Sequence, residues 1–477
     1  MKKVNEAPLF AKLQQFAQAK PISFHVPGHK SGMVFPDIGR KYFEPILPID
    51  LTELTGLDDL HASSGVIDEA QNLASKWFGS NNTYFLVGGS TVGNLAMILA
   101  RCSAGDKVLV QRNSHKSIMN GLELSGAKPI FLTPEFEERV NRYIAPSVDT
   151  VKKAVKSNPD SKALILTYPD YYGRAYPIKE MIDIAHSYHI PVLVDEAHGV
   201  HFSLDGNFPP SALKLGADVV VQSAHKMAPA MTMASYLHIK SSIVQTNHIE
   251  FYLQTLQSSS PSYPLLASLD LARYYLEGLT KADIMKVENS ARELRHYLNN
   301  CSLWDVLHPE MGIDDPLKIT LQVKQNADVS TIVAFLESEG VYPELWSDKQ
   351  ILFVHGLAPL HDFDRINHIV EIINQQLKLK ARSATIDSEN QLFIEKIKKL
   401  PLSYEEMKRR QVKQMSWDVL ENHIAAEAII PYPPGIPMIV KGEVVTKNHI
   451  KMFHNLMEQG IHFQNPKIKD GIKVFLP

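Results

Sequence analysis

Residues 218–226 read DVVVQSAHK, an apolar run that ends in a serine, a histidine and Lys226. Upstream, residues 191–199 read PVLVDEAHG, a second apolar run that ends in Asp195. Near-continuous apolar runs of this kind are typical of parallel strands that are buried on both faces. The carboxyl ends of such strands lie along one edge of the sheet, where ligands bind. The two runs therefore predict that a lysine and an aspartate share one site.

A lysine and an aspartate at this edge are the two groups that pyridoxal phosphate (PLP) needs from a protein. A deprotonated lysine amine forms a Schiff base with the cofactor aldehyde, and burial near a cationic ring favours that form. A carboxylate keeps the pyridine nitrogen protonated, so that the ring accepts electrons when a bond to the α-carbon breaks. We predict these roles for Lys226 and Asp195. The alternatives are a surface lysine and an aspartate that caps a turn.

The same alternation of short apolar runs and helical segments extends from about residue 83 to residue 240. We expect strands at residues 83–87, 107–112, 128–132, 162–167, 191–195, 218–223 and 233–239. Most of the segments between them have helical periodicity. This pattern predicts an α/β domain with a mostly parallel sheet.

The rest of the chain divides by composition. Residues 281–385 mix helical segments with strand-like runs such as KITLQV and predict a smaller α/β domain. Residues 380–400 are polar and predict a linker, and a C-terminal domain is expected over residues 395–477. We assign residues 1–50 to an N-terminal arm with an active-site loop and residues 51–280 to the large cofactor-binding domain.

A turn of small residues, GGST at 88–91, follows the first strong strand and opens a helix. Small residues let the backbone approach an anion, and the helix N-terminus offers N–H groups and a positive dipole end. We predict that Ser90 and Thr91 bind the cofactor phosphate, together with the hydroxyl of Ser223 and the imidazole of His225. The alternative is an ordinary helix cap.

Two further histidines follow predicted strands. His115, in QRNSHKS, is a candidate to stack on the cofactor ring, and the alternative is a histidine that makes local bonds at a helix start. His198 is placed to contact the cofactor or Asp195. The loop HVPGHK at residues 25–30 holds two more histidines, but no carboxylate or cysteine has ligand spacing to them, so we predict no metal site. We expect this loop to cover a shared active site.

Composition limits the partners of the chain. Its 477 residues carry a net charge of −3, which suggests neither a nucleic acid nor an anionic membrane as a partner. No apolar run reaches the ~18 residues that a membrane span requires. Cys102 and Cys301 lie in apolar contexts and are expected to be reduced core residues. We expect a soluble cytoplasmic protein.

Together, the motifs give a family resemblance. FHVPGHKSG, LDDLH, GGSTVGN, QRNSHKS, VDEAHG, QSAHK, SSSPSY and IIPYPPGIPM run from residue 24 to residue 438. The set resembles the Orn/Lys/Arg decarboxylase class-I family, whose members are fold-type I, aspartate aminotransferase-like PLP enzymes. Within it, the chain is most similar to the short Gram-positive arginine/lysine decarboxylase-like proteins. The turn GGST differs from the GTS-type turn of many relatives but keeps the hydroxyls.

The resemblance implies the same roles as the residues themselves suggest. It assigns the Schiff base to Lys226, the pyridinium contact to Asp195, ring stacking to His115, a ring-side position to His198, and phosphate binding to Ser90, Thr91, Ser223 and His225. It also implies a homodimer with a shared active site, in which Ser259 or its neighbours reach the phosphate of the other subunit. Cofactor-domain motifs begin almost at once, which favours a dimer or tetramer over the decamer of the large inducible members.

The implied activity is decarboxylation of a basic amino acid to agmatine or a diamine, in polyamine metabolism. Arginine is favoured by family analogy, with lysine and ornithine as alternatives, because the three differ only in the distal cation. Glu427 is the candidate carboxylate for that cation, and the alternative is a structural or surface charge. Two other functions stay open: an aminotransferase or other lyase on the same fold, and a catalytically silent paralogue that binds PLP.

Overall fold

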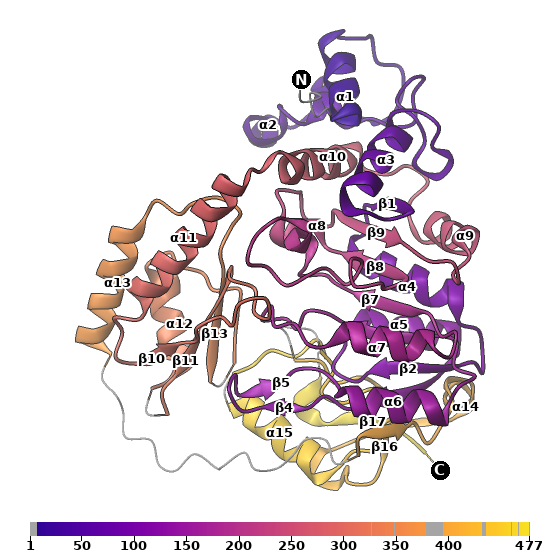
Figure 1. The fold of residues 1–477 in the computed structure, drawn as a ribbon, viewed down its shortest axis with the longest axis vertical. Helices are drawn as coiled ribbons and strands as arrows, with labels where there is room; N and C mark the ends of the chain where they lie inside the picture. The colour runs from indigo at the N-terminus through magenta and orange to yellow at the C-terminus, as the bar shows by residue number, and fades with distance from the viewer. Residues whose placement is uncertain are drawn as a thin grey trace. The chain divides into compact units, whose positions relative to one another are not determined.

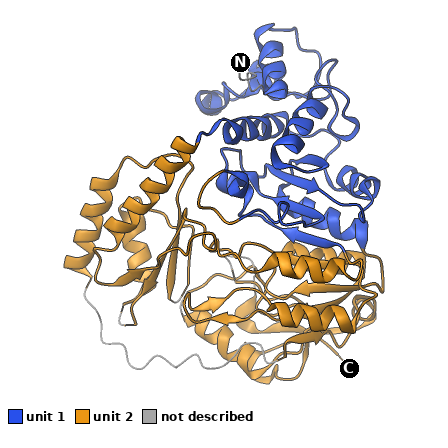
Figure 2. Ribbon diagram, in the orientation of Figure 1, with its two compact units in different colours: residues 1–101, 191–204, 210–280 blue, residues 102–190, 205–209, 281–477 orange. Residues whose placement is uncertain are grey.

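The structure is a computed structural model that describes residues 7–325, 327–347, 349–377, 395–431, 436–458, 460–465 and 467–476. The chain forms two compact units (Figure 2). Unit 1 comprises Met1–Arg101, Pro191–Leu204 and Pro210–Thr280, and unit 2 comprises Cys102–Ile190, Asp205–Pro209 and Lys281–Pro477. Most of the predicted linker, and residues 432–435 of the PYPPGIP motif, lie outside the described residues. The predicted domain limits stay a prediction.

Unit 1 contains strands in the order β1-β9-β8-β7 (Figure 1). Their bounds are Asn82–Leu86 for β1, Ser235–Ile239 for β9, Val219–Gln222 for β8 and Val192–Asp195 for β7. β7 and β8 are parallel, and β9 is antiparallel to both β8 and β1. Every residue of β7, β8 and β9 is buried, which explains why these runs are apolar throughout.

The helices of unit 1 are α1 (Pro8–Gln18), α2 (Asp37–Phe43), α3 (Val66–Phe78), α4 (Gly89–Arg101), α8 (Ala224–Met227), α9 (Thr246–Leu256) and α10 (Tyr263–Gly278). A buried carboxylate on α10 binds the first of these helices, α1. Asp270 on α10 accepts hydrogen bonds from the backbone N–H groups of Leu9 (3.0 Å) and Phe10 (3.3 Å), which lie in the first turn of α1. Those amides have no partner within their own helix, so Asp270 attaches the N-terminal arm to α10.

Unit 2 contains strands in the order β6-β2-β3-β14. Their bounds are Leu164–Thr167 for β6, Lys107–Gln111 for β2, Lys128–Leu132 for β3 and Ile397–Lys399 for β14. β2 is parallel to β3 and β6, whereas β14 is antiparallel to β3. The prediction of a linker over residues 380–400 is therefore wrong at its end. Ile397–Lys399 extends the sheet because the backbone N–H and C=O groups of an edge strand are free to pair.

The remaining elements next to these strands are α5 (Lys116–Ser125), α6 (Val148–Ser157), α7 (Ile178–His186) and the short hairpin β4 (Phe136–Glu137) and β5 (Arg142–Tyr143). The seven strands expected between residues 83 and 239 are all present, as β1, β2, β3, β6, β7, β8 and β9. The predicted α/β fold with a mostly parallel sheet is confirmed.

A separate antiparallel sheet, in the order β10-β11-β13-β12, lies in unit 2. Its strands are β10 (Trp304–Val306), β11 (Lys318–Val323), β12 (Leu345–Trp346) and β13 (Gln350–Val354), and its helices are α11 (Lys281–Leu298), α12 (Val329–Ser338) and α13 (Phe363–Gln376). Buried side chains of these elements, among them Trp304, Ile319 and Ile373, form one core cluster. Strand-like and helical segments were both expected in this region.

The C-terminal part has its own small core. Its elements are α14 (Tyr404–Arg409), β15 (Val412–Met415), β16 (Ile424–Ala425), α15 (Lys447–Glu458) and β17 (Ile472–Phe475). Trp417 stacks on Phe453 of α15 with ring centroids 3.7 Å apart. Ser403 and Glu406 form a capping box that starts α14, because each side chain bonds to the other residue's backbone N–H.

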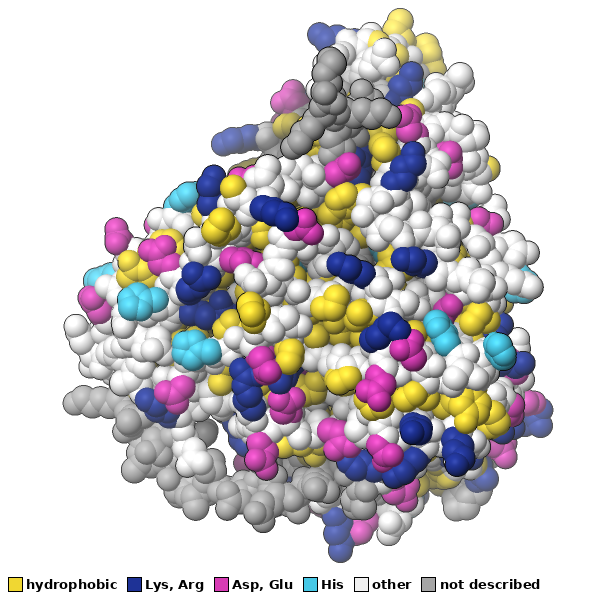
Figure 3. Space-filling model, in the orientation of Figure 1, with side chains coloured by type: hydrophobic (Ala, Val, Ile, Leu, Met, Phe, Trp, Pro, Cys, Tyr) yellow, Lys and Arg dark blue, Asp and Glu magenta, His cyan; other side chains and the backbone are white. Residues whose placement is uncertain are grey.

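The surface and the cysteines fit the composition. Basic and acidic side chains are interspersed over the face in Figure 3. Among the described residues, no helix is long and apolar enough to cross a membrane, and no cluster of His, Cys, Asp or Glu is arranged to hold a metal ion. Cys102 and Cys301 are both buried, as expected.

The packing of α4 gives a stability prediction. A Cβ atom added at Gly93 would lie 2.7 Å from Val221 Cγ1 and 2.8 Å from Leu86 Cδ1, closer than van der Waals contact allows. Gly93→Ala should lower the free energy of unfolding by about 1–3 kcal/mol because the core is overpacked. Urea unfolding followed by circular dichroism measures this change. The control is Gly278→Ala, where nothing lies within 4 Å, and an equal loss there would contradict the packing argument.

Candidate active site

Lys226 lies one turn beyond the end of β8. Ser223 leaves the strand in an extended conformation, and α8 begins at Ala224 and carries Lys226. The Nζ atom of Lys226 is 2.9 Å from Nε2 of His198, which follows β7 and is buried. The two strand ends that the sequence singles out thus place a lysine amine and an imidazole in direct contact, so that a proton can pass between them.

Asp195, the last residue of β7, is almost fully buried. Its Oδ2 atom accepts a hydrogen bond of 2.9 Å from Nδ2 of Asn94, and its Oδ1 atom accepts one of 3.2 Å from the backbone N–H of Ala197. These two donors hold the carboxylate in one orientation. The sequence analysis missed Asn94, although an amide inside the apolar helical run VGNLAMILA is a signal, because buried polar groups need specific partners.

The predicted phosphate-binding groups occupy three places in unit 1. Ser90 and Thr91 lie in the first turn of α4, which begins at Gly89 with φ +75°. The Ser223 hydroxyl is fully buried and has no hydrogen-bond partner among the described residues. The Nδ1 atom of His225 donates to the backbone oxygen of Ala234 at 3.1 Å, which orients its ring. A helix N-terminus and an unsatisfied buried hydroxyl are suited to an anion.

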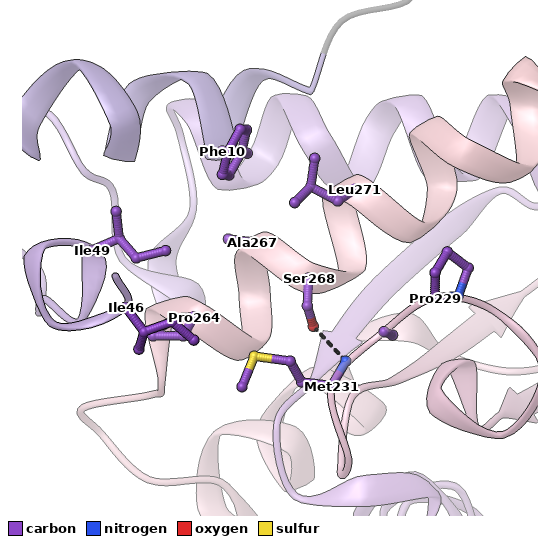
Figure 4. A pocket seen from close by; sticks show the side chains of 10 residues that line it. Phe10, Ile46, Ile49, Pro229, Met231, Pro264, Ala267, Ser268 and Leu271 are labelled. Atoms are coloured by element: carbon purple, nitrogen blue, oxygen red, sulfur yellow. Dashed lines mark hydrogen bonds between the residues drawn. The ribbon is translucent and has the colours of Figure 1, made fainter. Parts of the chain in front are cut away.

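An apolar pocket lies against the loop that follows Lys226 (Figure 4). Its cavity of about 420 Å³ is lined by Phe10, Ile46, Ile49, Pro229, Ala230, Met231, Pro264, Ala267, Ser268 and Leu271. Ser268 on α10 accepts a hydrogen bond of 3.2 Å from the backbone N–H of Met231. Residues of the N-terminal arm and of α10 therefore line the pocket beside the backbone that follows Lys226.

A buried chain of hydrogen bonds joins the ends of β7 and β8. Glu196 accepts from Gln222 Nε2 (2.6 Å), Ser211 Oγ (2.9 Å) and the backbone N–H of Ala212 (2.7 Å). Burial raises the pKa of Glu196 to about 7, against the effect of these three donors. Glu196 was not predicted as a site residue, because its role depends on Gln222, which is distant in the sequence.

The chain of hydrogen bonds continues across the sheet. Because Gln222 donates from its nitrogen, its oxygen accepts from His238 Nε2 at 3.0 Å. His238 Nδ1 then accepts from the hydroxyl of Thr83 at 2.8 Å. Burial lowers the pKa of His238 to about 3, which keeps the imidazole neutral and able to do both. The side chains of Glu196, Gln222, His238 and Thr83 are thus each satisfied by the next.

The other predicted site residues lie elsewhere in the chain. His115 belongs to unit 2, where it caps α5 and its Nδ1 atom accepts from the backbone N–H of Ser117 at 3.2 Å. Ser259 is exposed on the loop between α9 and α10. Glu427 accepts from the backbone N–H of Lys473 at 2.7 Å, so its carboxylate has a structural partner. The proposed roles of these three residues stay predictions.

A buried ion pair lies close to His115 in the sequence. Arg112, at the end of β2, donates to Glu443 at 2.6 Å and to the backbone oxygens of Pro437 (2.9 Å) and Met438 (3.1 Å). Although burial alone would raise it, the pKa of Glu443 falls to about 2 because Arg112 and Lys398 lie beside its carboxylate. The residues that follow the PYPPGI stretch are therefore held against the strand that leads to His115.

The residues of unit 1 fit PLP. Lys226 supplies an amine, Asp195 a buried carboxylate that Asn94 orients, and Ser223 a buried hydroxyl with no hydrogen-bond partner among the described residues. These are the groups that the aldehyde, the pyridine nitrogen and the phosphate of the cofactor require.

A search of solved structures identifies the class of protein. The lysine decarboxylase LdcF of Francisella novicida superimposes with a TM-score of 0.82 at 20% sequence identity, covering 99% of this chain and 81% of its own. At that identity the likeness concerns the fold alone. Together with the strand order, it shows that the chain has the α/β fold of that protein.

The chain belongs to the Orn/Lys/Arg decarboxylase family. Residues 7–362 match the major domain of that family and residues 388–464 match its C-terminal domain. An uncharacterized Bacillus subtilis protein, YaaO, is 44% identical over 97% of both chains. An arginine decarboxylase of Bacillus anthracis is 33% identical over 97% of this chain and 95% of its own. The resemblance drawn from the motifs is confirmed, as is the class of amino-acid decarboxylase, a PLP-dependent family.

The ion pair of Arg112 gives a second stability prediction. Glu443→Gln should destabilise the protein by about 3–5 kcal/mol at neutral pH, because it leaves a buried guanidinium without a charged partner. A carboxyl with a lowered pKa stabilises the fold above its unfolded pKa near 4.5, and this contribution disappears as the pH falls towards 2. The difference in unfolding midpoint from wild type should therefore be full above about pH 5 and shrink below it.

Thermal unfolding of both proteins at a series of pH values measures this difference. The matched control is Glu405→Gln, which removes an exposed carboxylate paired with Arg409 in the same C-terminal part and should cost less than about 1 kcal/mol. A pH-independent loss in Glu443→Gln would contradict the role of its charge.

Proposed function

We propose that this enzyme is a cytoplasmic homodimer that decarboxylates arginine to agmatine, in polyamine metabolism. The observation that supports it most is the contact between Lys226 and His198 beside a buried, hydrogen-bonded Asp195. Arginine is preferred over lysine and ornithine because full-length relatives at about one third identity are arginine decarboxylases. Lysine and ornithine remain the alternative substrates, since the fold is shared with lysine decarboxylases.

In this proposal each residue has one task. PLP, when bound, withdraws electrons from the α-carbon as carbon dioxide leaves. Lys226 would hold the cofactor through Nζ, and Asp195 would place its carboxylate against the pyridine nitrogen. Lys226 or His198 then returns a proton to the α-carbon. Their 2.9 Å contact lets either group pass a proton to the other. His115 stacks on the ring, and Ser90, Thr91, Ser223 and His225 bind the phosphate.

The exposed apolar side chains of the N-terminal arm support the homodimer. Among the large apolar residues that are more than half exposed are Ile22, Phe24, Val26, Met33, Val34, Ile38, Tyr42 and Phe43. Contiguous exposed apolar surface of this kind marks protein interfaces. Ser259 is exposed on its loop. A residue that reaches a second subunit must lie on the surface, so this position is compatible with the proposed role.

Two other functions give different results. An aminotransferase would use the same lysine and aspartate. Given an amino acid, it would form pyridoxamine phosphate and a keto acid without releasing carbon dioxide, and a second keto acid would then restore PLP. A silent paralogue would bind PLP and release no carbon dioxide. The intact set of cofactor-binding residues argues against loss of activity.

Substitution of the lysine tests the site. Lys226→Ala should abolish turnover, because it removes the amine that would hold the cofactor and that contacts His198 at 2.9 Å. Carbon dioxide release measures the loss, and circular dichroism shows whether the variant is folded. The matched control is Lys214→Ala, an exposed lysine in the same unit, which should keep full activity. Substantial decarboxylation by Lys226→Ala would refute the assignment.

A substrate panel tests the choice of amino acid. PLP-loaded enzyme should release carbon dioxide and agmatine from arginine faster than it releases diamines from lysine or ornithine. Glu427→Gln should then change this preference if its carboxylate pairs with the distal cation. An unchanged preference would show that Glu427 does not select the substrate and has a structural role, such as its contact with the backbone N–H of Lys473. Release from lysine alone would overturn the choice of arginine but not the reaction.

A further inference from the structure

A second cavity lies in unit 2, between α11 and the loop that leads to β11. Its volume is about 460 Å³, within the range of sites for small molecules. One wall is a single face of α11, formed by Glu288, Arg292, Arg295, His296 and Asn299. Apart from the adjacent pair Arg295 and His296, successive residues are three or four positions apart, which places them along one side of the helix. The other wall is formed by His308, Pro309, Met311, Asp314 and Pro316, with Asn207 in addition.

Arg295 is the unusual member of this cavity. It is 6% exposed, and its guanidinium donates to the backbone oxygens of Lys318 (2.8 Å) and Ala291 (3.4 Å). Its Nε atom has no hydrogen-bond partner, and no carboxylate of the described residues forms an ion pair with it. Burial lowers the pKa of Arg295 to about 10, even with Asp315 and Asp314 in the neighbourhood. A buried charge that is so incompletely paired is costly.

The carboxylates of the cavity are engaged by other groups. Glu288 accepts from the backbone N–H and the side-chain amide of Asn207, both at 2.7 Å. Asp314 accepts from Arg174 at 2.9 Å through each of its oxygens. Arg292, by contrast, donates to the neutral oxygen of Asn289 and, within the described part of the chain, forms no ion pair. The N–H groups of Arg292 and of Arg295 Nε are therefore the donors of this cavity that a negative ligand can use.

We propose that this cavity, formed by Arg292, Arg295, His296 and His308, binds a small multivalent anion of the phosphate or polycarboxylate type. Two arginines and two imidazoles supply N–H donors, and charge-assisted hydrogen bonds to such oxygens are strong. Pro309, Pro316 and Met311 add an apolar side, which suits an anion with a carbon skeleton. The proposed reaction assigns no role to Arg292, Arg295, His296 or His308.

Calorimetry on the PLP-loaded enzyme tests the proposal, with inorganic pyrophosphate and citrate as probes at fixed ionic strength. The bound cofactor occupies its own phosphate site, so heat reports a second site. Pyrophosphate binding alone identifies a phosphate site, citrate binding alone a polycarboxylate site, and binding of both a site that recognises charge. If neither probe binds, the proposal is overturned.

Variants locate the binding. Arg292→Gln with His296→Gln removes two exposed donors and should weaken binding at least about tenfold, since hydrogen bonds to charged groups are the stronger ones. Lys286→Gln is the control, because it removes one charge from the same helix outside the cavity. Arg295→Met should abolish binding, but it can also disturb the contact with Lys318. Equal affinity in wild type and the Arg292/His296 variant would contradict the assignment.

Discussion

The parallel pairing of β7 with β8 is the constraint on which the site depends. In this register Asp195 lies beside Val221, so the chain leaves both strands at the same edge of the sheet. A slip by one residue would turn every side chain to the opposite face, and Asp195 would lose Asn94 of α4. Glu196, just after β7, binds Gln222, the last residue of β8, and so fixes this register from the side chains.

Fixing the register in this way places polar side chains inside a sheet that is otherwise apolar. A carboxylate, an amide and an imidazole would each cost free energy if they were buried alone. The chain of hydrogen bonds from Thr83 through His238 and Gln222 to Glu196 gives each of them a partner. The neutrality of His238 follows from this, because an imidazolium could not accept from Thr83. The arrangement specifies one register, since any other would leave these groups unpaired.

The sequence predicts the parts of the molecule that depend on local pattern. The strands of the parallel sheet are found because each is an apolar run that a turn follows, and Lys226 and Asp195 are found because they end such runs. Asn94 and Glu196 were missed because their importance depends on distant partners, Asp195 and Gln222. β14 was missed for a similar reason: a polar edge strand has no apolar pattern of its own, and its pairing with β3 depends on tertiary structure.

The ion pair between Arg112 and Glu443 follows a different logic. Burying two charges gives little net stability, because desolvation offsets their attraction, but removing one partner is costly. Such a pair therefore contributes most by selecting one arrangement of the groups around it. Here the guanidinium also binds the carbonyl oxygens of Pro437 and Met438, so it selects a backbone path as well as a charge partner. Arg112 is three residues before His115. The short segment between β2 and α5 therefore holds the C-terminal loop and also carries the proposed ring-stacking histidine.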